Sequence, residues 1–190
     1  MSVALLIPAY NPAARLQDLV RTLAEAGVFS RIVVVDDGSH AASAPVFTAI
    51  GALPGVSVLC HAANRGKGAA LKSGFAHILE SGDETAIVTA DADGQHAPAD
   101  IVRVAQASLA APEKFILGAR AFDTSVPWRS AFGNRLTRLV MRLATGARLT
   151  DTQTGLRAWP RRLAVAAGDI ASNGYEFEMD ALLRALKTLR

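Results

Sequence analysis

The residues best suited to chemistry lie in four short polar segments, each of which follows an apolar run. One is Asp91-Ala-Asp-Gly-Gln-His96, directly after Ala86–Ala90. In extended backbone, residues i and i+2 project to the same side, so Asp91 and Asp93 can converge on one hard cation while Gln95 supplies a third oxygen. This donor set suits Mg²⁺ or Mn²⁺ bridging two phosphates of a nucleotide. An EF-hand-like calcium loop is the alternative, but its later acidic positions are missing.

Two further segments combine acidic or basic residues with glycine. In Asp36-Asp-Gly-Ser39, two adjacent carboxylates leave a buried strand, so they need partners: base or ribose donors, a metal, or a helix N-terminus. Asn64-Arg-Gly-Lys-Gly68 opens a stretch of helical length, and Lys67 adds positive charge where a phosphate would bind. The spacing is not that of a Walker A loop.

The remaining segment is Pro8-Ala-Tyr-Asn-Pro12. Proline cannot continue a strand ladder, so the first strand is expected to end at Pro8. Tyr10 offers a flat face that could pack against a planar ring. An ordinary turn and helix start at Asn11-Pro12 is the alternative.

Short apolar runs alternate with stretches of helical length. Val3–Ile7 and Ile32–Val35 are apolar at every position, which is typical of parallel strands covered on both faces. Further strands are expected at Val56–Cys60, Thr85–Ala90 and Phe115–Gly118, and helices at Ala14–Ala26, Ser43–Ala52, Gly68–Glu80 and Pro98–Ala110. This order predicts an α/β fold with a doubly wound, mostly parallel sheet, which binds ligands at the carboxyl ends of its strands.

The alternation stops after residue 118. Asn134–Leu149 predicts an amphipathic helix in which Arg135, Arg138 and Arg142 form a basic stripe beside an apolar one. Such a helix either packs on the core with solvated arginines or lies on an anionic lipid surface. The chain ends in another helical stretch, Glu178–Arg190, without a Gly or Pro to stop it.

Composition predicts one globular domain. The 190 residues are 51% hydrophobic and 19% charged, which excludes disorder and fibrous repeats. A single cysteine, Cys60, fits a reducing compartment, and no apolar run approaches the roughly 18 residues that span a bilayer, so we expect a cytoplasmic protein. Residues 1–100 carry 6 Lys or Arg against 10 Asp or Glu, whereas residues 101–190 carry 14 against 7. The basic half indicates an anionic partner, and no nucleic-acid-binding module is recognisable.

The chain resembles a family 2 glycosyltransferase with the Rossmann-like GT-A fold. The resemblance rests on the order and spacing of Pro8-Ala-Tyr-Asn11, Val35-Asp-Asp-Gly-Ser39, Asn64-Arg-Gly-Lys-Gly68 and Asp91-Ala-Asp-Gly-Gln-His96. The most similar branch is the dolichol-phosphate mannosyltransferase and polyprenyl-phosphate glucosyltransferase type. The resemblance implies one catalytic domain over residues 1–190, with the nucleotide and metal sites in 1–100 and the acceptor site in 101–190.

The resemblance also implies roles for individual residues. Pro8, Tyr10 and Asn11 would line the base and ribose, and Asp37 would bind the base. The diphosphate would be held through the metal at Asp91, Asp93 and Gln95, with Asp93 counted as catalytic. The residues expected to contact the nucleotide sugar are Pro8, Tyr10, Asn11, Asp37, Lys67, Asp91 and Ala92.

Two later segments carry the resemblance into the basic half. Gly118-Ala-Arg120 is similar to a stretch with an arginine near the acceptor, which makes Arg120 a catalytic candidate. Asp151-Thr-Gln-Thr-Gly-Leu-Arg157 is similar to the D-x-Q-[ST]-G-F piece of the family, with Leu156 in place of Phe. Arg129 and Arg135 are further candidates to clamp the acceptor phosphate, because guanidinium binds phosphate through two parallel hydrogen bonds.

The expected reaction is transfer of a sugar from a nucleotide diphosphate sugar, of the GDP-mannose or UDP-glucose type, to a polyprenyl phosphate such as dolichyl or undecaprenyl phosphate. Attack on the anomeric carbon is in line and inverts it. A phosphate acceptor is largely ionised near neutral pH and needs no strong base, so catalysis would rest on positioning and on the metal.

Two alternatives differ from this reaction in the acceptor or in the absence of turnover. Transfer to a saccharide hydroxyl would need a carboxylate base, for which Asp151 or Glu178 is the candidate. A non-catalytic sugar-nucleotide-binding module is a further alternative. Some relatives continue into transmembrane helices, and we expect a catalytic part cut short at Arg190, with peripheral contact at the inner face of the membrane.

Overall fold

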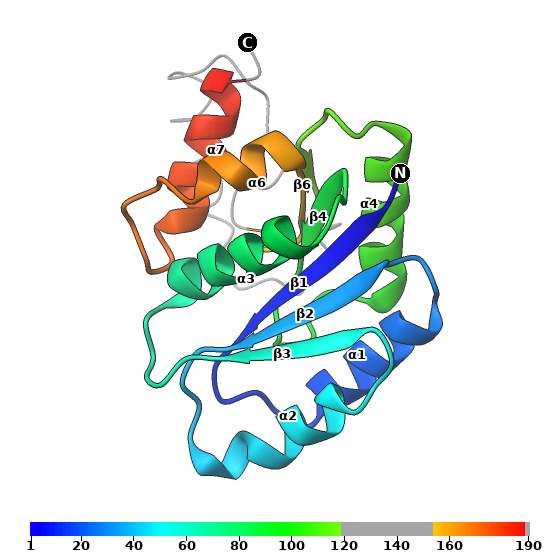
Figure 1. Ribbon diagram of the computed structural model, residues 1–190, viewed down its shortest axis with the longest axis vertical. Coiled ribbons are helices and arrows are strands. Elements are labelled where there is room, and N and C mark those ends of the chain that lie inside the picture. Colours follow the sequence, from blue (N-terminus) through cyan, green and yellow to red (C-terminus); the bar gives the residue numbers. More distant parts are fainter. Residues whose placement is uncertain (119–153, 189–190) are drawn as a thin grey trace, which may run out of the picture.

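A six-stranded sheet runs through the computed structural model, which describes residues 1–118 and 154–188 (Figure 1). The strands lie in the order β3-β2-β1-β4-β6-β5. Their bounds are β1 Val3–Ala9, β2 Arg31–Asp36, β3 Val56–Cys60, β4 Ala86–Thr89, β5 Ile116–Leu117 and β6 Arg157–Pro160. The first four strands are parallel, whereas β6 is antiparallel to both β4 and β5. The predicted α/β fold with a mostly parallel sheet is confirmed.

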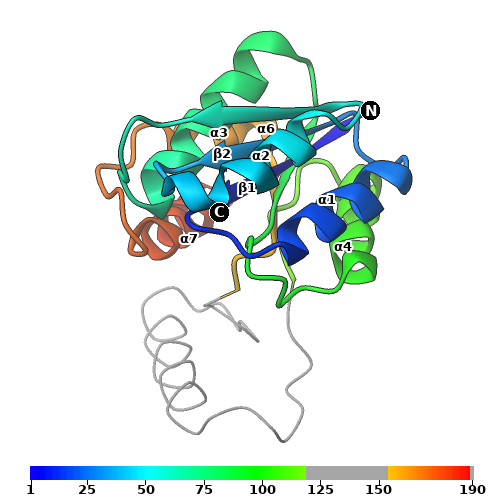
Figure 2. The same cartoon turned by 90° about the horizontal axis from the view of Figure 1, so that it is seen from below.

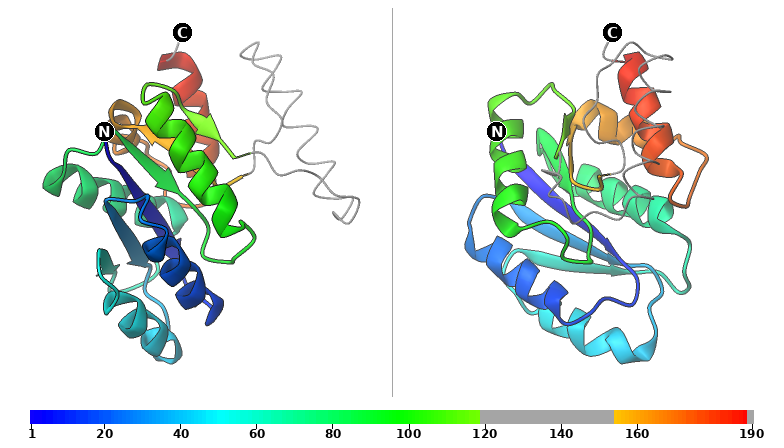
Figure 3. Two further views of the ribbon diagram at one scale, coloured as in Figure 1. Left: turned by 90° about the vertical axis from the view of Figure 1, so that its right-hand side faces the viewer. Right: turned by 180° about the vertical axis from the view of Figure 1, so that it is seen from behind.

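Helices cover both faces of this sheet. One face carries α1 Arg15–Glu25, α2 Ala44–Gly51 and α4 Pro98–Ala110, and the short 3-10 helix η1 Ala41–Ser43 precedes α2. The other face carries α3 Lys67–Ser81, α6 Arg161–Ala167 and α7 Phe177–Thr188. Figure 2 shows α1 and α4 on one side of the strands and α3 and α6 on the other. The view from behind in Figure 3 brings α1, α2 and α4 to the front.

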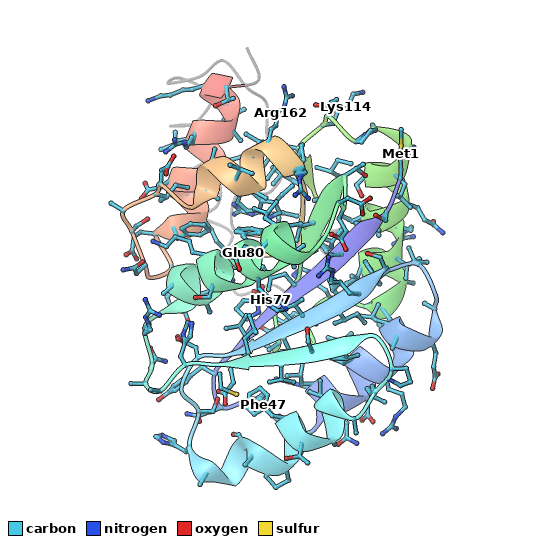
Figure 4. The ribbon with its side chains drawn as sticks, viewed as in Figure 1. Met1, Phe47, His77, Glu80, Lys114 and Arg162 are labelled. Atoms are coloured by element: carbon cyan, nitrogen blue, oxygen red, sulfur yellow. The ribbon has the colours of Figure 1, made fainter. Side chains whose placement is uncertain are left out.

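The position of β1 between two layers of helices explains why its sequence is apolar throughout. Val3, Leu5 and Ile7 pack with α1, α2 and α4, whereas Ala4 and Leu6 pack with α3, α6 and α7. Successive side chains of a strand point to opposite faces, so both sets are buried. On α2 the buried residues are Phe47 and Ile50; Figure 4 labels Phe47.

The expectation that β1 ends at Pro8 is wrong. Pro8 and Ala9 remain in the strand, opposite Val35 and Asp36 of β2. The pairing of β1 with β4 already ends at Leu6, so β1 has a strand partner on one side only at Pro8, where a missing N–H is tolerated as it is at a sheet edge.

The sequence did not predict β6, a strand of four residues. Its centre is Trp159, whose ring contacts Phe75, Phe115 and Phe177 at centroid distances of 5.2, 4.9 and 6.4 Å. The indole N–H donates to Thr89 Oγ1 at 3.1 Å, so the one polar atom of the indole is paired inside this aromatic cluster. Strand β6 thereby joins the later part of the chain to β4, α3 and α7.

A buried carboxylate ties the amino ends of the strands together. Glu84, 4% exposed, precedes β4 and accepts bonds from Arg31 Nε at 2.7 Å, Arg31 Nη2 at 2.9 Å and Ser30 Oγ at 3.0 Å. Burial opposes its ionisation, but these donors outweigh the burial, so the pKa of Glu84 lies below its usual value.

Replacing Glu84 with Gln should cost about 2–3 kcal/mol of unfolding free energy at pH 7, because an amide would face the Arg31 donors. A carboxyl whose pKa is lowered by folding stabilises the protein above its unfolded pKa and stops doing so as pH falls through the folded value. The difference between wild type and Glu84→Gln should therefore shrink below about pH 4.5, the ordinary value for this group. Urea unfolding at several pH values measures it.

Glu113→Gln is the matched control. The Glu113 carboxylate is 78% exposed and lies 3.5 Å from Arg162 on α6 (Figure 4), so its loss should cost no more than about 0.5 kcal/mol. Equal effects of the two changes would contradict the assignment.

Candidate functional site

The site lies where the strand order reverses at β1. Strands β2 and β4 flank β1, and the loops leaving these three strands meet at their carboxyl ends, the usual ligand position in an open α/β sheet. There they enclose a cavity of about 450 Å³ together with the start of α3 and Tyr175 from the loop before α7. It is lined by Pro8, Ala9, Tyr10, Asn11, Pro12, Ala13, Arg15, Asp37, Asn64, Gly66, Lys67, Ala70, Asp91, Ala92, Asp93 and Tyr175.

Asn11 fastens the loop after β1 to the loop after β2. Its backbone N–H donates to Ser39 Oγ and its side-chain oxygen accepts from the backbone N–H of His40, both at 2.8 Å. The φ of Asn11 is 48°, a left-handed conformation that asparagine tolerates better than most residues. Tyr10 lines the cavity and is 47% exposed, so its side chain remains accessible to a ligand.

The two adjacent carboxylates after β2 have different partners. Asp36 Oδ1 accepts the backbone N–H of Ser39 at 2.8 Å and closes the local turn. Asp37 is 3% exposed and reaches across to the start of α3, where Oδ1 accepts from Arg65 N at 3.0 Å and Oδ2 from Gly66 N at 2.8 Å. Of the partners considered for this pair, the helix N-terminus is the one observed within the protein. Asp37 still lines the cavity.

His61 is a further partner of Asp37. Its Nδ1 lies 2.7 Å from Asp37 Oδ1 and its Nε2 lies 2.9 Å from Ser73 Oγ on α3. The sequence reasoning did not single out His61, although it directly follows β3 and so lies at the same edge of the sheet as the other loops.

Lys67 joins three elements through two ion pairs. Its Nζ lies 2.6 Å from Asp91 Oδ1, after β4, and 3.0 Å from Glu178 Oε2, on α7. Burial disfavours the ammonium, but the two carboxylates outweigh it, so the pKa of Lys67 is raised. Burial likewise opposes ionisation of Asp91, but the neighbouring His96 ring and the Lys67 ammonium hold its pKa well below the usual range. Lys67 and Asp91 are therefore both charged at neutral pH.

The segment after β4 has the donor chemistry of a divalent-cation site. Asp91 and Asp93 both line the cavity, and Gln95 N donates to Asp93 Oδ1 at 2.9 Å, which fixes the turn. His96 Nε2 is buried 3.7 Å from Asp91 Oδ2 and has no hydrogen-bond partner among the described residues, so bonding capacity beside Asp91 is unused. Two carboxylates beside an open cavity fit Mg²⁺ or Mn²⁺ that takes its other oxygens from water and a phosphate.

The loop before α7 packs against the start of α3. Asn173 O accepts the backbone N–H of Ala69 at 3.1 Å, and Lys72 Nζ donates to Ile170 O at 2.8 Å and Ser172 O at 3.2 Å. This packing places Tyr175, 81% exposed, at the cavity.

The sequence model of the family described as glycosyl transferase family 2 matches residues 4–165 of the chain. The chain belongs to glycosyltransferase family 2. Both the predicted family and the likeness to its polyprenyl-phosphate branch are confirmed.

Curated relatives of this family 2 glycosyltransferase match along nearly the whole chain. An uncharacterized protein of Methanocaldococcus jannaschii is 32% identical over 97% of this chain and 76% of its own length. The UDP-N-acetylglucosamine–dolichyl-phosphate N-acetylglucosaminyltransferase of Methanococcus voltae is 30% identical, with 97% and 80% covered. The polyprenol monophosphomannose synthase of Mycolicibacterium smegmatis is 30% identical, with 95% and 71% covered.

A solved structure shows the same GT-A fold. Glucosyl-3-phosphoglycerate synthase of Mycobacterium tuberculosis, in complex with Mn²⁺, UDP-glucose and phosphoglyceric acid, superposes with a TM-score of 0.76 at 19% identity. The match covers 99% of this chain, and the chain spans 66% of the length of that protein.

Most residues predicted for the nucleotide sugar of this glycosyltransferase lie together. Pro8, Tyr10, Asn11, Asp37, Lys67, Asp91, Ala92 and Asp93 all line the cavity. Gln95 is next to it and is not part of the lining. The acceptor candidates Arg120, Arg129 and Arg135, the basic stripe with Arg138 and Arg142, and Asp151 lie outside the described residues.

The sequence reasoning did not single out Tyr175 and Asn64 as individual site residues. Asn64 belongs to a segment that it did select, but Tyr175 follows no strand. An aromatic residue in Gly174-Tyr-Glu-Phe177, directly before a helix, is the one local signal that could have pointed to it.

Asp37→Asn should lower the unfolding free energy by about 2–3 kcal/mol, because one amide oxygen cannot replace two carboxylate oxygens that accept from three N–H groups. Asp36→Asn is the control, since its amide oxygen can still accept from Ser39 N, and should cost less than about 1 kcal/mol. Urea unfolding measures both, and a smaller loss for Asp37→Asn than for Asp36→Asn would refute the role of Asp37 at the helix start.

Gly68→Ala should destabilise the protein by about 1–3 kcal/mol, although alanine normally favours helices. A Cβ at Gly68 would lie 2.6 Å from Phe177 Cβ and 2.9 Å from the Asn173 carbonyl. In Gly51→Ala on α2 the new Cβ would meet only Val58 Cγ2 at 3.6 Å, an ordinary contact, so that variant should keep or raise stability. Thermal unfolding of both decides it; a more stable Gly68→Ala would contradict the close packing.

Proposed function

We propose that this chain transfers a sugar from a nucleotide diphosphate sugar to the phosphate of a polyprenyl phosphate, with inversion at the anomeric carbon. The observation that carries the proposal is the cavity at the ends of β1, β2 and β4, where Lys67 at the start of α3 pairs with Asp91 and where Asp93 is also part of the lining. Relatives named for dolichyl-phosphate and polyprenol substrates support the acceptor class.

The donor is proposed to lie along the cavity. Tyr10, Pro8 and Asn11 would line the base and ribose, and Asp37 would accept a hydrogen bond from the base. Lys67, positively charged at a helix N-terminus, would face the diphosphate. GDP-mannose-like and UDP-glucose-like donors share this diphosphate.

Asp91, Asp93 and Gln95 are the residues proposed to hold Mg²⁺ or Mn²⁺. When bound, such an ion offsets the negative charge that develops on the departing nucleoside diphosphate. The support is the donor set of this segment and the Mn²⁺ bound with UDP-glucose in the M. tuberculosis synthase. Lys67 keeps Asp91 ionised before any ligand arrives.

The acceptor side is proposed to be basic. Arg120, Arg129 and Arg135 would clamp the lipid phosphate, which is already largely ionised near neutral pH and needs no strong base. Among residues 1–118 and 154–188, no helix combines the length and apolarity needed to cross a bilayer. Contact with the inner face of a membrane is proposed to come from the stripe of Arg135, Arg138 and Arg142.

A hydroxyl acceptor is the second candidate, favoured by one observation. The Glu178 carboxylate lies 3.0 Å from Lys67 Nζ and so stands close to the donor site, where a general base would be needed. The identity of the product separates the two reactions.

Incubation with radiolabelled sugar nucleotides, Mg²⁺ and a short-chain polyprenyl phosphate should give a product that extracts into organic solvent. Asp93→Asn should lower the rate at least about 100-fold, because the amide keeps the turn with Gln95 but loses the charge that binds the cation. Asp18→Asn, the same change at a 78% exposed site on α1, should leave the rate unchanged.

Three other outcomes would contradict the metal assignment, the acceptor class or the catalytic activity. Full activity of Asp93→Asn with metal present would overturn the metal assignment. Label found only in water-soluble product would indicate a hydroxyl acceptor, and nucleotide binding without turnover would indicate a non-catalytic module.

A further inference from the structure

The hydrogen bonds around Asp37 restrict what a ligand can offer it. Each carboxylate oxygen accepts about two hydrogen bonds. Oδ1 already receives His61 Nδ1 at 2.7 Å and Arg65 N at 3.0 Å, whereas Oδ2 receives only Gly66 N, at 2.8 Å, from the described residues. Asp37 lines the cavity with its acceptor capacity at Oδ1 filled and one position left at Oδ2.

Contacts with Asp36 and Ser73 hold the His61 ring in the position where its Nδ1 occupies an acceptor position of Asp37 Oδ1. The backbone N–H of His61 donates to Asp36 O at 2.9 Å, and its ring, 8% exposed, lies between Asp37 and Ser73. Because the carboxylate can only accept, Nδ1 carries the hydrogen, and the Ser73 hydroxyl can donate to Nε2. Neither His61 nor Ser73 lines the described cavity, so the ring acts through Asp37 rather than on a ligand.

The order Ser73, His61, Asp37 also resembles a nucleophilic triad. A triad serine must face the substrate, and Ser73 on α3 is not among the residues that line the cavity. The arrangement therefore positions the carboxylate and gives no sign of hydrolase chemistry.

The nucleotide bases differ in the hydrogen-bond donors that they can present to the one free acceptor position on Asp37 Oδ2. Uracil and thymine present a single ring N–H between two carbonyl groups, which matches one acceptor. Guanine presents a ring N–H and an amino group side by side, which match a carboxylate only if both oxygens are free. Cytosine has no ring N–H on this edge. A buried donor without an acceptor lowers affinity by about tenfold to a hundredfold.

We infer that the cavity selects nucleotides whose base is a pyrimidine-2,4-dione, uracil or thymine, over guanine, and that His61 is the positioning residue that sets this selectivity by occupying Asp37 Oδ1. The inference rests on the proposed use of the cavity for a sugar nucleotide and narrows its donor.

Equilibrium binding of UDP, dTDP, GDP and CDP to the purified chain with Mg²⁺ tests it. Wild type should bind UDP at least tenfold more tightly than GDP or CDP, and the dTDP arm shows whether the methyl group of thymine is accepted. His61→Leu removes the donor at similar size and should reduce the UDP-to-GDP ratio at least fivefold.

Two variants separate selectivity from stability. His61→Asn retains an N–H close to the position of Nδ1 and should keep the ratio within twofold of wild type. Ser73→Ala removes the hydroxyl that contacts His61 Nε2 and leaves the Nδ1 donor in place. It should therefore lower thermal stability and leave the UDP-to-GDP ratio largely unchanged.

GDP binding as tight as UDP binding in wild type would overturn the inference, and so would an unchanged ratio in folded His61→Leu. If His61→Leu does not fold, the ratios of wild type and His61→Asn still decide the matter. GDP-selective binding together with an organic-extractable product would leave the proposed function intact, whereas absence of binding to every nucleoside diphosphate would remove both.

Discussion

The arrangement of the site depends on one buried carboxylate. Asp37 must find hydrogen-bond donors because an unpaired charge inside a protein is strongly unfavourable, and it finds them in the first backbone N–H groups before α3 and in His61. The positive end of the α3 helix dipole faces the same carboxylate. Because Asp37 leaves the end of β2 and Lys67 begins α3, this interaction fixes where the Lys67 ammonium enters the cavity.

Lys67 then links the two halves of the chain. It pairs with Asp91 from the acidic half and with Glu178 from the basic half. The position of Glu178 is fixed by a second contact, because the fully buried Arg157 of β6 donates to the Glu178 backbone oxygen at 2.6 Å. The later part of the sequence thus completes the site through backbone packing and one ion pair. A substitution at Arg157 should therefore disturb the ion pair between Glu178 and Lys67.

Sequence reasoning predicted what depends on local pattern. The bounds of β3 and α4 are as expected, because unbroken apolar runs and helical periodicity report burial directly. It did not predict β6, where a buried arginine, a tryptophan and a proline in four residues hide the strand pattern, or the continuation of β1 through Pro8. The motifs located the cavity, but the partners of Asp37 come from residues 24 to 29 positions away, and no local pattern carries that pairing.

The distribution of charge is suited to the proposed reaction. Transfer leaves a nucleoside diphosphate with one more negative charge than the donor had, while the acceptor phosphate monoester becomes a diester with one fewer. Positive charge is therefore needed most on the leaving side as the bond breaks. Lys67, which we propose faces the diphosphate, is kept charged by the carboxylates of Asp91 and Glu178. On the acceptor side, guanidinium groups would bind the lipid phosphate most strongly before transfer and less strongly afterwards, which favours product release.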